Sequence, residues 1–190
     1  MTHAIETERL YLRQWQASDF AIFAEMNANP EVMQYFPKLL STTVSNTIAK
    51  KCQQLIEEKG WGLWAVSLKN GVEKRDAFIG FVGLNDTHAD MSFAPAVEIA
   101  WRLHKDYWGQ GYATEAARAA LEFAFTELAL EEVVSFTAVI NKRSQLIMQR
   151  IGMINTQDNF YHPALKPDHR LAEHVLYKMT QQQWQNTVAT

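Results

Sequence analysis

The stretch Val97-Glu-Ile-Ala-Trp-Arg-Leu-His-Lys-Asp-Tyr-Trp-Gly-Gln-Gly-Tyr112 decides the fold. Its first seven residues alternate, with Val97, Ile99, Trp101 and Leu103 on one face and Glu98, Ala100 and Arg102 on the other. This period of two predicts a β-strand over 97–103. Residues 104–112 are predicted to form a loop. From 113 to 128, alanine and leucine recur at helical spacing, which predicts a helix whose small residues suit close packing on a sheet.

The predicted loop has the composition of a phosphate-binding site. A loop that leads into a helix presents unpaired backbone N–H groups and the positive end of the helix dipole. Gly109 and Gly111 carry no side chain, so an anion can approach those groups. The Gly-x-Gly spacing alone also fits an ordinary tight turn. The chain has no G-x-x-x-x-G-K-S/T motif, and Thr114 stands where the dinucleotide fingerprint needs glycine or alanine.

Working outward, the rest of the chain predicts an α/β domain. The elements predicted before this stretch are a strand within 7–15, a helix starting at Ser18-Asp19, a helix capped by Thr42 or Thr43, a strand over 62–68, a turn at Asn70-Gly71 and a strand over 78–84. Those predicted after it are a strand over 133–139, a helix capped by Asn141 and ending at Gly152, a strand near Met153, a long loop through Pro163 and Pro167, and a strand over 174–179. This order is typical of an α/β domain with a mixed sheet.

Length and composition narrow the class of protein. The 190 residues suit one domain, and 47% hydrophobic with 21% charged residues is an ordinary globular balance. A net charge of −3 without a basic tract argues against general nucleic-acid binding. One cysteine, Cys52, excludes an internal disulfide. With no secretion signal or bilayer-length apolar run, a cytoplasmic location is expected, and the six histidines show no metal-binding spacing.

Several of these motifs together resemble the GNAT acetyltransferases. The similar segments are Val97–Leu103, Tyr107–Ala116, Asn141-Lys-Arg-Ser144 and Ile151-Gly152. Thr7–Arg13 and Asn29–Met33 also resemble the RimJ/RimL-like branch, which acetylates the N-termini of ribosomal proteins. The resemblance implies a single GNAT domain over residues 7–180. Its expected fold is a mixed, mostly antiparallel sheet that splays after the fourth strand and is flanked by helices.

The resemblance implies acetyl-CoA as the acetyl donor, with no metal. The pantetheine amides are expected to pair with the main chain of Ile99, Ala100, Trp101 and Leu103. The pyrophosphate is expected on the backbone of Trp108, Gly109, Gln110, Gly111, Tyr112 and Ala113. Asn141 would bind the pantetheine arm, and Lys142 or Arg143 the nucleotide phosphates, although a solvated helix start also explains those two charges.

The catalytic residues are expected from the chemistry of amine acetylation. A protonated amine cannot attack a thioester, so a base must remove its proton. Glu98 is the first candidate for this base, and Asp158, His162 and His174 are weaker candidates. If Glu98 is not the base, it is a structural carboxylate at the strand edge. Met148 stands where many relatives have a tyrosine acid, whereas Ser144 matches the serine proposed to meet the thiolate. Ser144 equally fits a serine that bonds the helix N-terminus.

No covalent enzyme intermediate is required, so Cys52 is expected to pack a helix. The acceptor is a primary amine on a protein N-terminus, a polyamine, an aminoglycoside or an amino-acid derivative. Its binding site is expected between Met33, Tyr35 and Phe36 of one irregular segment and Phe160 and His162 of another, although these residues also fit plain packing. No nucleic acid or membrane partner is expected, and the family makes a homodimer plausible.

Two other functions fit the same loop. One is a sensor that binds acyl-CoA without turnover, which the missing tyrosine leaves open. The other is a nucleotide-binding protein, for which ATP or NAD would stabilise the fold as much as acetyl-CoA does.

Overall fold

The structure, a computed structural model, describes residues 4–69 and 77–188. The predicted Asn70-Gly71 turn lies outside these residues. The chain divides into two compact units, and three elements contribute residues to both: strand β4 (Phe78–Asp86), strand β5 (Val97–Leu103) and helix α3 (Tyr112–Thr126). One unit takes in the residues up to Leu84 together with Ala100–Ala120, and the other takes in Asn85–Ile99 together with the residues from Leu121 onward.

The strands of the first unit follow the order β1-β2-β3-β4-β5. They are β1 (Ile5–Glu6), β2 (Leu10–Arg13), β3 (Leu63–Leu68), β4 (Phe78–Asp86) and β5 (Val97–Leu103), of which β4 and β5 extend past the unit. The pairs β1–β2, β2–β3 and β3–β4 are antiparallel. The strand predicted within 7–15 is confirmed as β2, in which Leu10 and Leu12 are fully buried.

Strands β4 and β5 approach closely at Gly80. A Cβ atom placed on Gly80 would lie 2.2 Å from the Arg102 carbonyl oxygen and 2.7 Å from Leu103 Cα. The φ of Gly80 is +141°, a value that residues with side chains rarely adopt. Beyond the strand, the N–H of His104 donates to the Ile79 carbonyl oxygen at 2.8 Å. Gly80 therefore allows β4 to lie against the end of β5, where the glycine loop begins.

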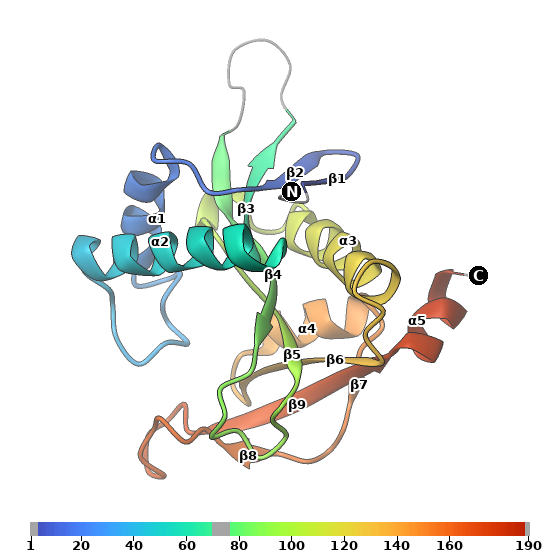
Figure 1. Cartoon of the computed structure of the whole chain (residues 1–190). Coiled ribbons are helices and arrows are strands. Elements are labelled where there is room, and N and C mark those ends of the chain that lie inside the picture. Colours follow the sequence, from blue (N-terminus) through green and yellow to red (C-terminus); the bar gives the residue numbers. More distant parts are fainter. Residues whose placement is uncertain (1–3, 70–76, 189–190) are drawn as a thin grey trace. The chain divides into compact units, whose positions relative to one another are not determined.

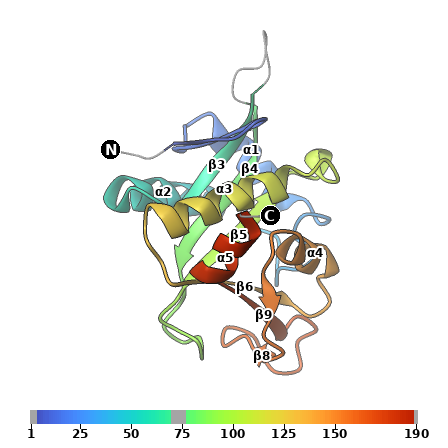
Figure 2. The ribbon, with the colours of Figure 1, turned by 90° about the vertical axis from the view of Figure 1, so that its right-hand side faces the viewer.

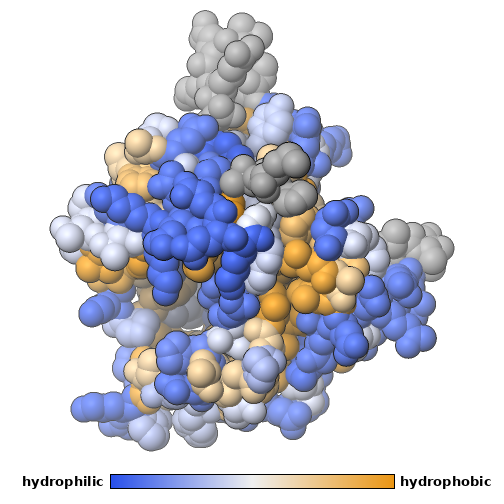
Figure 3. Space-filling model, in the orientation of Figure 1, coloured by the Kyte–Doolittle hydropathy of each residue, from blue (hydrophilic) through white to orange (hydrophobic). Residues whose placement is uncertain are grey.

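Helices cover both faces of this part of the sheet. Helices α1 (Asp19–Ala28) and α2 (Thr42–Lys59) pack against each other on one face, and the part of α3 (Tyr112–Thr126) up to Ala120 covers the other (Figures 1 and 2). The visible outer side of α2 is hydrophilic, as expected for a helix with one buried face (Figure 3). An aromatic cluster lies beneath α1, where the Trp15 ring is 5.0 Å from Phe23 and 5.4 Å from Phe78.

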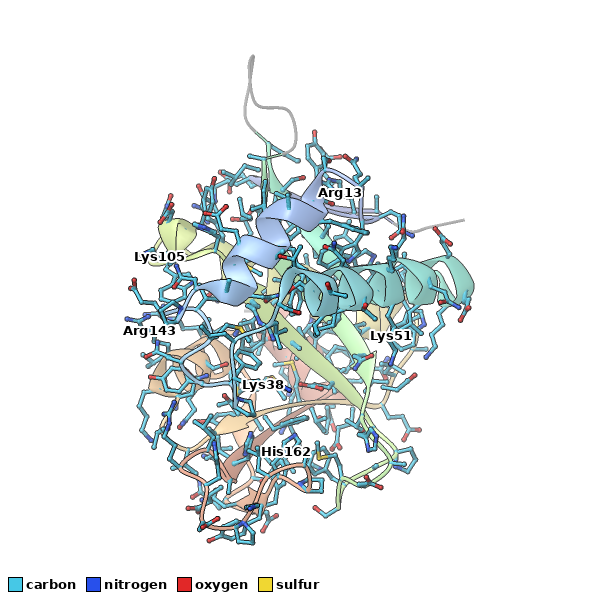
Figure 4. All side chains as sticks on the ribbon, turned by 90° about the vertical axis from the view of Figure 1, so that its left-hand side faces the viewer. Arg13, Lys38, Lys51, Lys105, Arg143 and His162 are labelled. Atoms are coloured by element: carbon cyan, nitrogen blue, oxygen red, sulfur yellow. The ribbon has the colours of Figure 1, made fainter. Side chains whose placement is uncertain are left out.

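Helix α1 begins at the predicted Ser18-Asp19, whereas the cap of α2 differs from the sequence prediction. Ser18 makes no side-chain cap; instead the Asp19 carboxylate binds Arg13 at 2.8 Å and accepts the Gln16 N–H (Figure 4). Thr42 and Thr43 do not cap α2, because Ser41 does so by accepting the Val44 N–H at 3.3 Å. A hydroxyl caps best from the residue just before the first helical turn, and Ser41 occupies that position.

The second unit is built on a long antiparallel pair. Strand β6 (Glu132–Ala138) runs along β9 (Glu173–Thr180) from Glu132↔Thr180 to Ala138↔His174. Short strands β7 (Ile154–Asn155) and β8 (Phe160–Tyr161) also pair with β9. Strand β5 joins β6 in parallel at Glu98↔Val134. Helices α4 (Lys142–Arg150) and α5 (Gln181–Val188) contact β6 and β9 respectively (Figure 2). The predicted mixed, mostly antiparallel sheet is confirmed.

The sequence prediction missed several short elements. Residues 104–112 are not all loop, since Lys105–Tyr107 form a 3-10 turn whose start is capped by His104 accepting the Asp106 N–H. Strand β8 forms inside the predicted late loop because it finds β9 as a partner. Helix α5 was missed because its sequence is polar, and the ring of Trp184 stacks on Phe125 with centroids 5.5 Å apart.

Candidate active site

The loop before α3 carries a row of unpaired main-chain donors. Within the described residues, the N–H groups of residues 109–114 donate to no protein acceptor, and the first paired one is that of Glu115, bonded to the Gly111 carbonyl. Gly109 and Gly111 have φ values of +75° and +83°, which favour glycine. A Cβ on Gly109 would meet nothing within 4 Å. The predicted glycine loop is therefore an open main-chain surface at a helix N-terminus, which suits an anion.

An ion pair from β2 holds this loop in shape. The Arg9 guanidinium binds Glu115 through Nε at 2.6 Å and donates through Nη1 to the Gln110 carbonyl oxygen at 3.0 Å. It also lies 4.6 Å from the centre of the Tyr112 ring. Because a trans peptide points its C=O and N–H in opposite directions, the Gly111 N–H is turned away from Arg9. Arg9 thus orients part of the donor row.

Glu115 is the anchor of that arrangement. Its carboxylate accepts the Thr7 hydroxyl at 2.6 Å and the Arg9 backbone N–H at 2.9 Å, besides the Arg9 side chain. Burial opposes ionisation, but these hydrogen bonds and the Arg9 charge lower the pKa of Glu115. Sequence reasoning assigned no role to this cluster. Its only signal was that Thr7, Arg9 and Glu115 lie in segments that carry the family resemblance.

The residues expected to pair with pantetheine lie on β5. Ala100, Trp101 and Leu103 belong to the first unit, where the Leu103 carbonyl oxygen accepts the Trp108 indole N–H at 2.9 Å. Ile99 belongs to the second unit, and its carbonyl oxygen accepts the Ser135 hydroxyl at 2.9 Å. Ile99 thus already has a protein donor on that oxygen, and pantetheine pairing along the strand stays a prediction.

The first segment expected to bind the acceptor divides into core and surface. Met33 is only 3% exposed and contributes to the core of the first unit. Tyr35 is half-buried, and Phe36 is exposed. The Phe36 ring centre lies 4.0 Å from Cζ of Arg102, so this segment does reach β5.

Glu98 has the environment of a proton-accepting group. It is partly exposed, and none of the described residues bonds or ion-pairs with its carboxylate. Burial raises the pKa of Glu98 to about 8. Because it pairs with Val134 of β6, it lies on the same sheet face as Phe136, two residues further along.

A ring cluster on that same face contains the second pair of expected acceptor residues. It consists of Phe93, Phe136, Phe160, His162 and His174. Phe93 and Phe160 have ring centres 5.1 Å apart, and those of His162 and His174 are 5.0 Å apart. Burial lowers the pKa of both histidines, and the pKa of His162 is lowered further by the charge of His88. The structure therefore brings Phe160 and His162 together with a second candidate base.

The start of α4 positions the remaining predicted residues. Asn141 caps the helix as predicted, since its Oδ1 accepts the Ser144 N–H at 3.3 Å and its amide donates to the Thr137 hydroxyl at 2.9 Å. The Ser144 hydroxyl has no hydrogen-bond partner among the described residues. Arg143 is exposed in the first turn (Figure 4). Met148 is buried in the core, and Asp158 is exposed on a loop.

Two kinds of feature are absent from the described part of the chain. Its His, Cys, Asp and Glu residues form no group of three that could hold a metal ion. None of its helices combines the length and the apolar character needed to cross a bilayer.

Comparisons with known proteins agree with this geometry. Residues 9–154 match the family model described as "Acetyltransferase (GNAT) domain". The matched stretch contains the glycine loop, Glu98 and the start of α4. Across 180 residues the chain is 24% identical to the uncharacterized N-acetyltransferase YnaD of Bacillus subtilis. The aligned residues cover 95% of this chain and 98% of that protein.

Solved structures show the same fold. One is a spermidine N-acetyltransferase from Vibrio cholerae in complex with CoA and spermine, with a TM-score of 0.72, 18% identity and coverage of 95% of this chain and 100% of that one. Another is the ribosomal-protein-S5-alanine acetyltransferase from Vibrio fischeri, with a TM-score of 0.72, 17% identity and coverage of 96% and 98%.

Proposed function

The chain belongs to the GNAT acetyltransferase family, and from that premise we propose that it moves the acetyl group of acetyl-CoA directly to a primary amine held in the same complex. The observation that carries this proposal is the row of unpaired N–H groups over residues 109–114, which lies inside the stretch that the family model matches. The family uses acetyl-CoA as its acetyl donor. We propose that residues 7–180 act as one domain, since the matched stretch includes residues of both compact units.

The residues present fit acetyl-CoA. A pyrophosphate needs several donors and no crowding side chain, and the open backbone at Gly109 and Gly111 meets both needs. We assign the pyrophosphate to the main chain from Trp108 to Ala113, and the pantetheine to β5 from Ile99 to Leu103. Asn141 and Arg143 at the start of α4 are the assigned partners of the pantetheine arm and the nucleotide phosphates. Bound acetyl-CoA supplies a thioester whose carbonyl carbon the amine attacks.

Glu98 is the proposed proton acceptor. An amine is protonated near neutral pH and must lose a proton before it becomes a nucleophile. A carboxylate with a pKa of about 8 takes up that proton more readily than an ordinary one. His162 and His174, whose pKa values are lowered, are uncharged at neutral pH and form the second choice.

The remaining steps concern charge that develops on oxygen and sulfur. A main-chain N–H of β5 is the proposed donor to the thioester oxygen as it gains negative charge. Ser144 is the proposed hydrogen-bond donor to the departing thiolate, and its hydroxyl is uncommitted within the described part of the chain. A hydroxyl is a weak acid, so we assign it hydrogen bonding rather than full proton transfer.

The proposed acceptor is a primary amine, as the family resemblance implies. The likeness of Thr7–Arg13 and Asn29–Met33 to the ribosomal-protein branch supports a protein N-terminus or a small primary amine. The ring cluster and Phe36 are the proposed acceptor contacts. A cytoplasmic location and a homodimer remain predictions.

Release of free CoA thiol, measured with acetyl-CoA and a panel of amines, tests the proposal. The unmodified chain should release thiol only when a primary amine is present. Gly111→Val should weaken acetyl-CoA binding at least tenfold, because valine strains a φ of +83° and crowds Arg9. Tight binding without turnover on any amine would contradict the proposed function and favour a sensor. Unchanged affinity in Gly111→Val would contradict the phosphate site.

A further inference from the structure

A half-buried guanidinium in the first unit has no counter-charge. Arg102 of β5 donates through Nη1 to Asn27 Oδ1 at 2.6 Å. Its Nε is buried and has no hydrogen-bond partner. No carboxylate of the described residues forms an ion pair with Arg102.

The groups packed around Arg102 are neutral. The ring centres of Phe36 and Phe81 lie 4.0 Å and 5.4 Å from its Cζ. Asn27 is fully buried and is itself fixed by a hydrogen bond to the Ser45 hydroxyl at 3.1 Å. Cys52 of α2 interacts with it electrostatically, but burial raises the pKa of this thiol to about 11, so it carries no charge at neutral pH.

Arg102 is nevertheless charged. Burial lowers its pKa only to about 10, which leaves the guanidinium protonated under physiological conditions. Withdrawing a cation from water costs free energy unless an anion pairs with it. An unpaired cation in such a place is therefore unusual. The charge of Arg102 is kept here, with two rings near its Cζ and an Nε that has no partner, and this points to a site that pairs with an anion from outside the chain.

The chemistry of that anion follows from the side chain and its place. A guanidinium presents a planar fork of donors that matches a carboxylate. Arg102 lies beside the exposed Phe36 of the expected acceptor segment, and the alternation along β5 puts it on the face that carries Glu98. An anion bound to Arg102 is therefore on the acceptor side of the strand, opposite the face of Ile99 and Trp101.

We propose that the acceptor amine also carries a carboxylate, which Arg102 binds; this inference rests on the proposed function. An α-amino acid is one source of such a group, and a peptide with an acidic N-terminal residue is another. A polyamine is disfavoured, because its second ammonium would lie near an unpaired cation. The negative net charge of the whole chain does not alter this, since local charge governs a buried site.

Matched acceptor pairs provide the test. Phenylalanine is compared with phenethylamine and lysine with cadaverine, while an Asp-Ala-Ala amide is compared with its Asn counterpart. The carboxylated member of at least one pair should have a kcat/KM roughly 10- to 100-fold higher, the range of a charge-assisted hydrogen bond. The first two pairs report an amino acid and the third a peptide. Equal rates within all three pairs, or spermidine as the best acceptor, would overturn the inference.

Variants tie the preference to this residue. Arg102→Gln, which keeps a donor for Asn27, should abolish the preference, whereas Arg102→Lys should retain part of it. Lys38→Gln is the control, because Lys38 is an exposed cation on the segment that follows α1 (Figure 4). This control should leave the preference unchanged. A preference that survives Arg102→Gln, or is lost in Lys38→Gln, would contradict the role of Arg102.

A binding measurement separates this inference from the proposed function. N-acetylphenylalanine and its uncharged amide are compared as stabilisers in thermal melts, which need no turnover. The acid should raise Tm more than the amide in the unmodified chain, and equally little in Arg102→Gln. If no amine releases thiol but the acid still stabilises through Arg102, the proposed transfer fails and the anion site stands. Equal stabilisation by acid and amide, together with equal rates for the Asp and Asn peptides, contradicts the anion site alone.

Discussion

At the scale of single residues, the proposed role of Glu98 as proton acceptor sets the expected pH dependence of the reaction. Its pKa of about 8 means that the proton-accepting form becomes populated only as the pH rises toward that value. Glu98→Gln should lower kcat/KM by roughly 100-fold at pH 8, within the range of general-base catalysis. It should also remove an inflection near pH 8 that the unmodified chain shows with the same amine. Identical pH–rate profiles for the two proteins would clear Glu98 of this role and point to His162 or His174.

The same residue affects stability, with a definite sign. Burial raises the folded-state pKa of Glu98 above its ordinary value of 4.5, so folding favours the protonated form. The penalty on folding is therefore absent below pH 4.5, grows between pH 4.5 and 8, and is constant above that range. Glu98→Gln should leave the free energy of unfolding nearly unchanged at pH 4.5 and raise it by a few kcal/mol at pH 9, because each pKa unit corresponds to about 1.4 kcal/mol. Urea melts at the two pH values measure this difference.

Glu115 gives a prediction about the phosphate loop rather than the chemistry. Glu115→Gln removes the charge that holds Arg9 in place, so Gln110 and the donor row lose their fixed orientation. The Kd for acetyl-CoA should rise by roughly 3- to 10-fold, as loss of one charge-assisted contact implies. Glu122→Gln, an exposed carboxylate on α3, is the matched control. If calorimetric titration shows equal Kd values for the two variants, the ion pair does not organise the loop.

At the scale of elements, the contact of β4 with β5 depends on Gly80. A Cβ there would overlap the main chain of β5 at 2.2 Å, and backbone cannot yield as a side chain does. Gly80→Ala should therefore destabilise the fold by about 3 kcal/mol or more. Gly109→Ala has an unfavourable positive φ but no neighbour within 4 Å, so it should lose only about 1 kcal/mol. Chemical denaturation of the two variants gives the comparison, and equal losses would show that the close approach is not strict.

Local patterns explain which elements were predictable. The strand over 97–103 was located to the residue because its alternation is uninterrupted, and the glycine loop was predictable because all of its residues are adjacent in sequence. Helix α5 was not predicted, because its buried side depends on the contact of Trp184 with Phe125, and the polar local sequence does not indicate that contact. The cap of α2 was predicted one or two residues too late, at Thr42 or Thr43 and not at Ser41. Hydrophobic periodicity does not locate a helix start to a single residue when several hydroxyl residues are adjacent.

Long-range contacts mark the limit for the site. Arg9 meets Glu115 across 106 residues, and Arg102 meets Asn27 across 75. No single-sequence pattern pairs residues so far apart, so these charges were assigned no function from the sequence. The predicted donors around Gly111, by contrast, required only that a helix start there.

At the scale of the whole molecule, acetyl-CoA should stabilise the folded chain by mass action. At a ligand concentration 100 times Kd, the gain is about 2.7 kcal/mol. For a chain of this length, that corresponds to a rise in Tm of roughly 5–10 °C. NAD and ATP at equal concentration should raise Tm far less, and Gly111→Val should lose most of the response to acetyl-CoA. Equal shifts with all three compounds, measured by scanning calorimetry, would indicate a general nucleotide site.

The burial of Cys52 has a practical consequence for all of these assays. It is the only cysteine in the sequence, its side chain is 6% exposed, and its pKa of about 11 keeps it as the unreactive thiol. Colorimetric reagents such as Ellman's should therefore stay colourless with the folded enzyme and report only newly liberated coenzyme. For the same reason, storage in air should produce neither cross-linked dimers nor mixed adducts with the coenzyme, so reductant can be omitted.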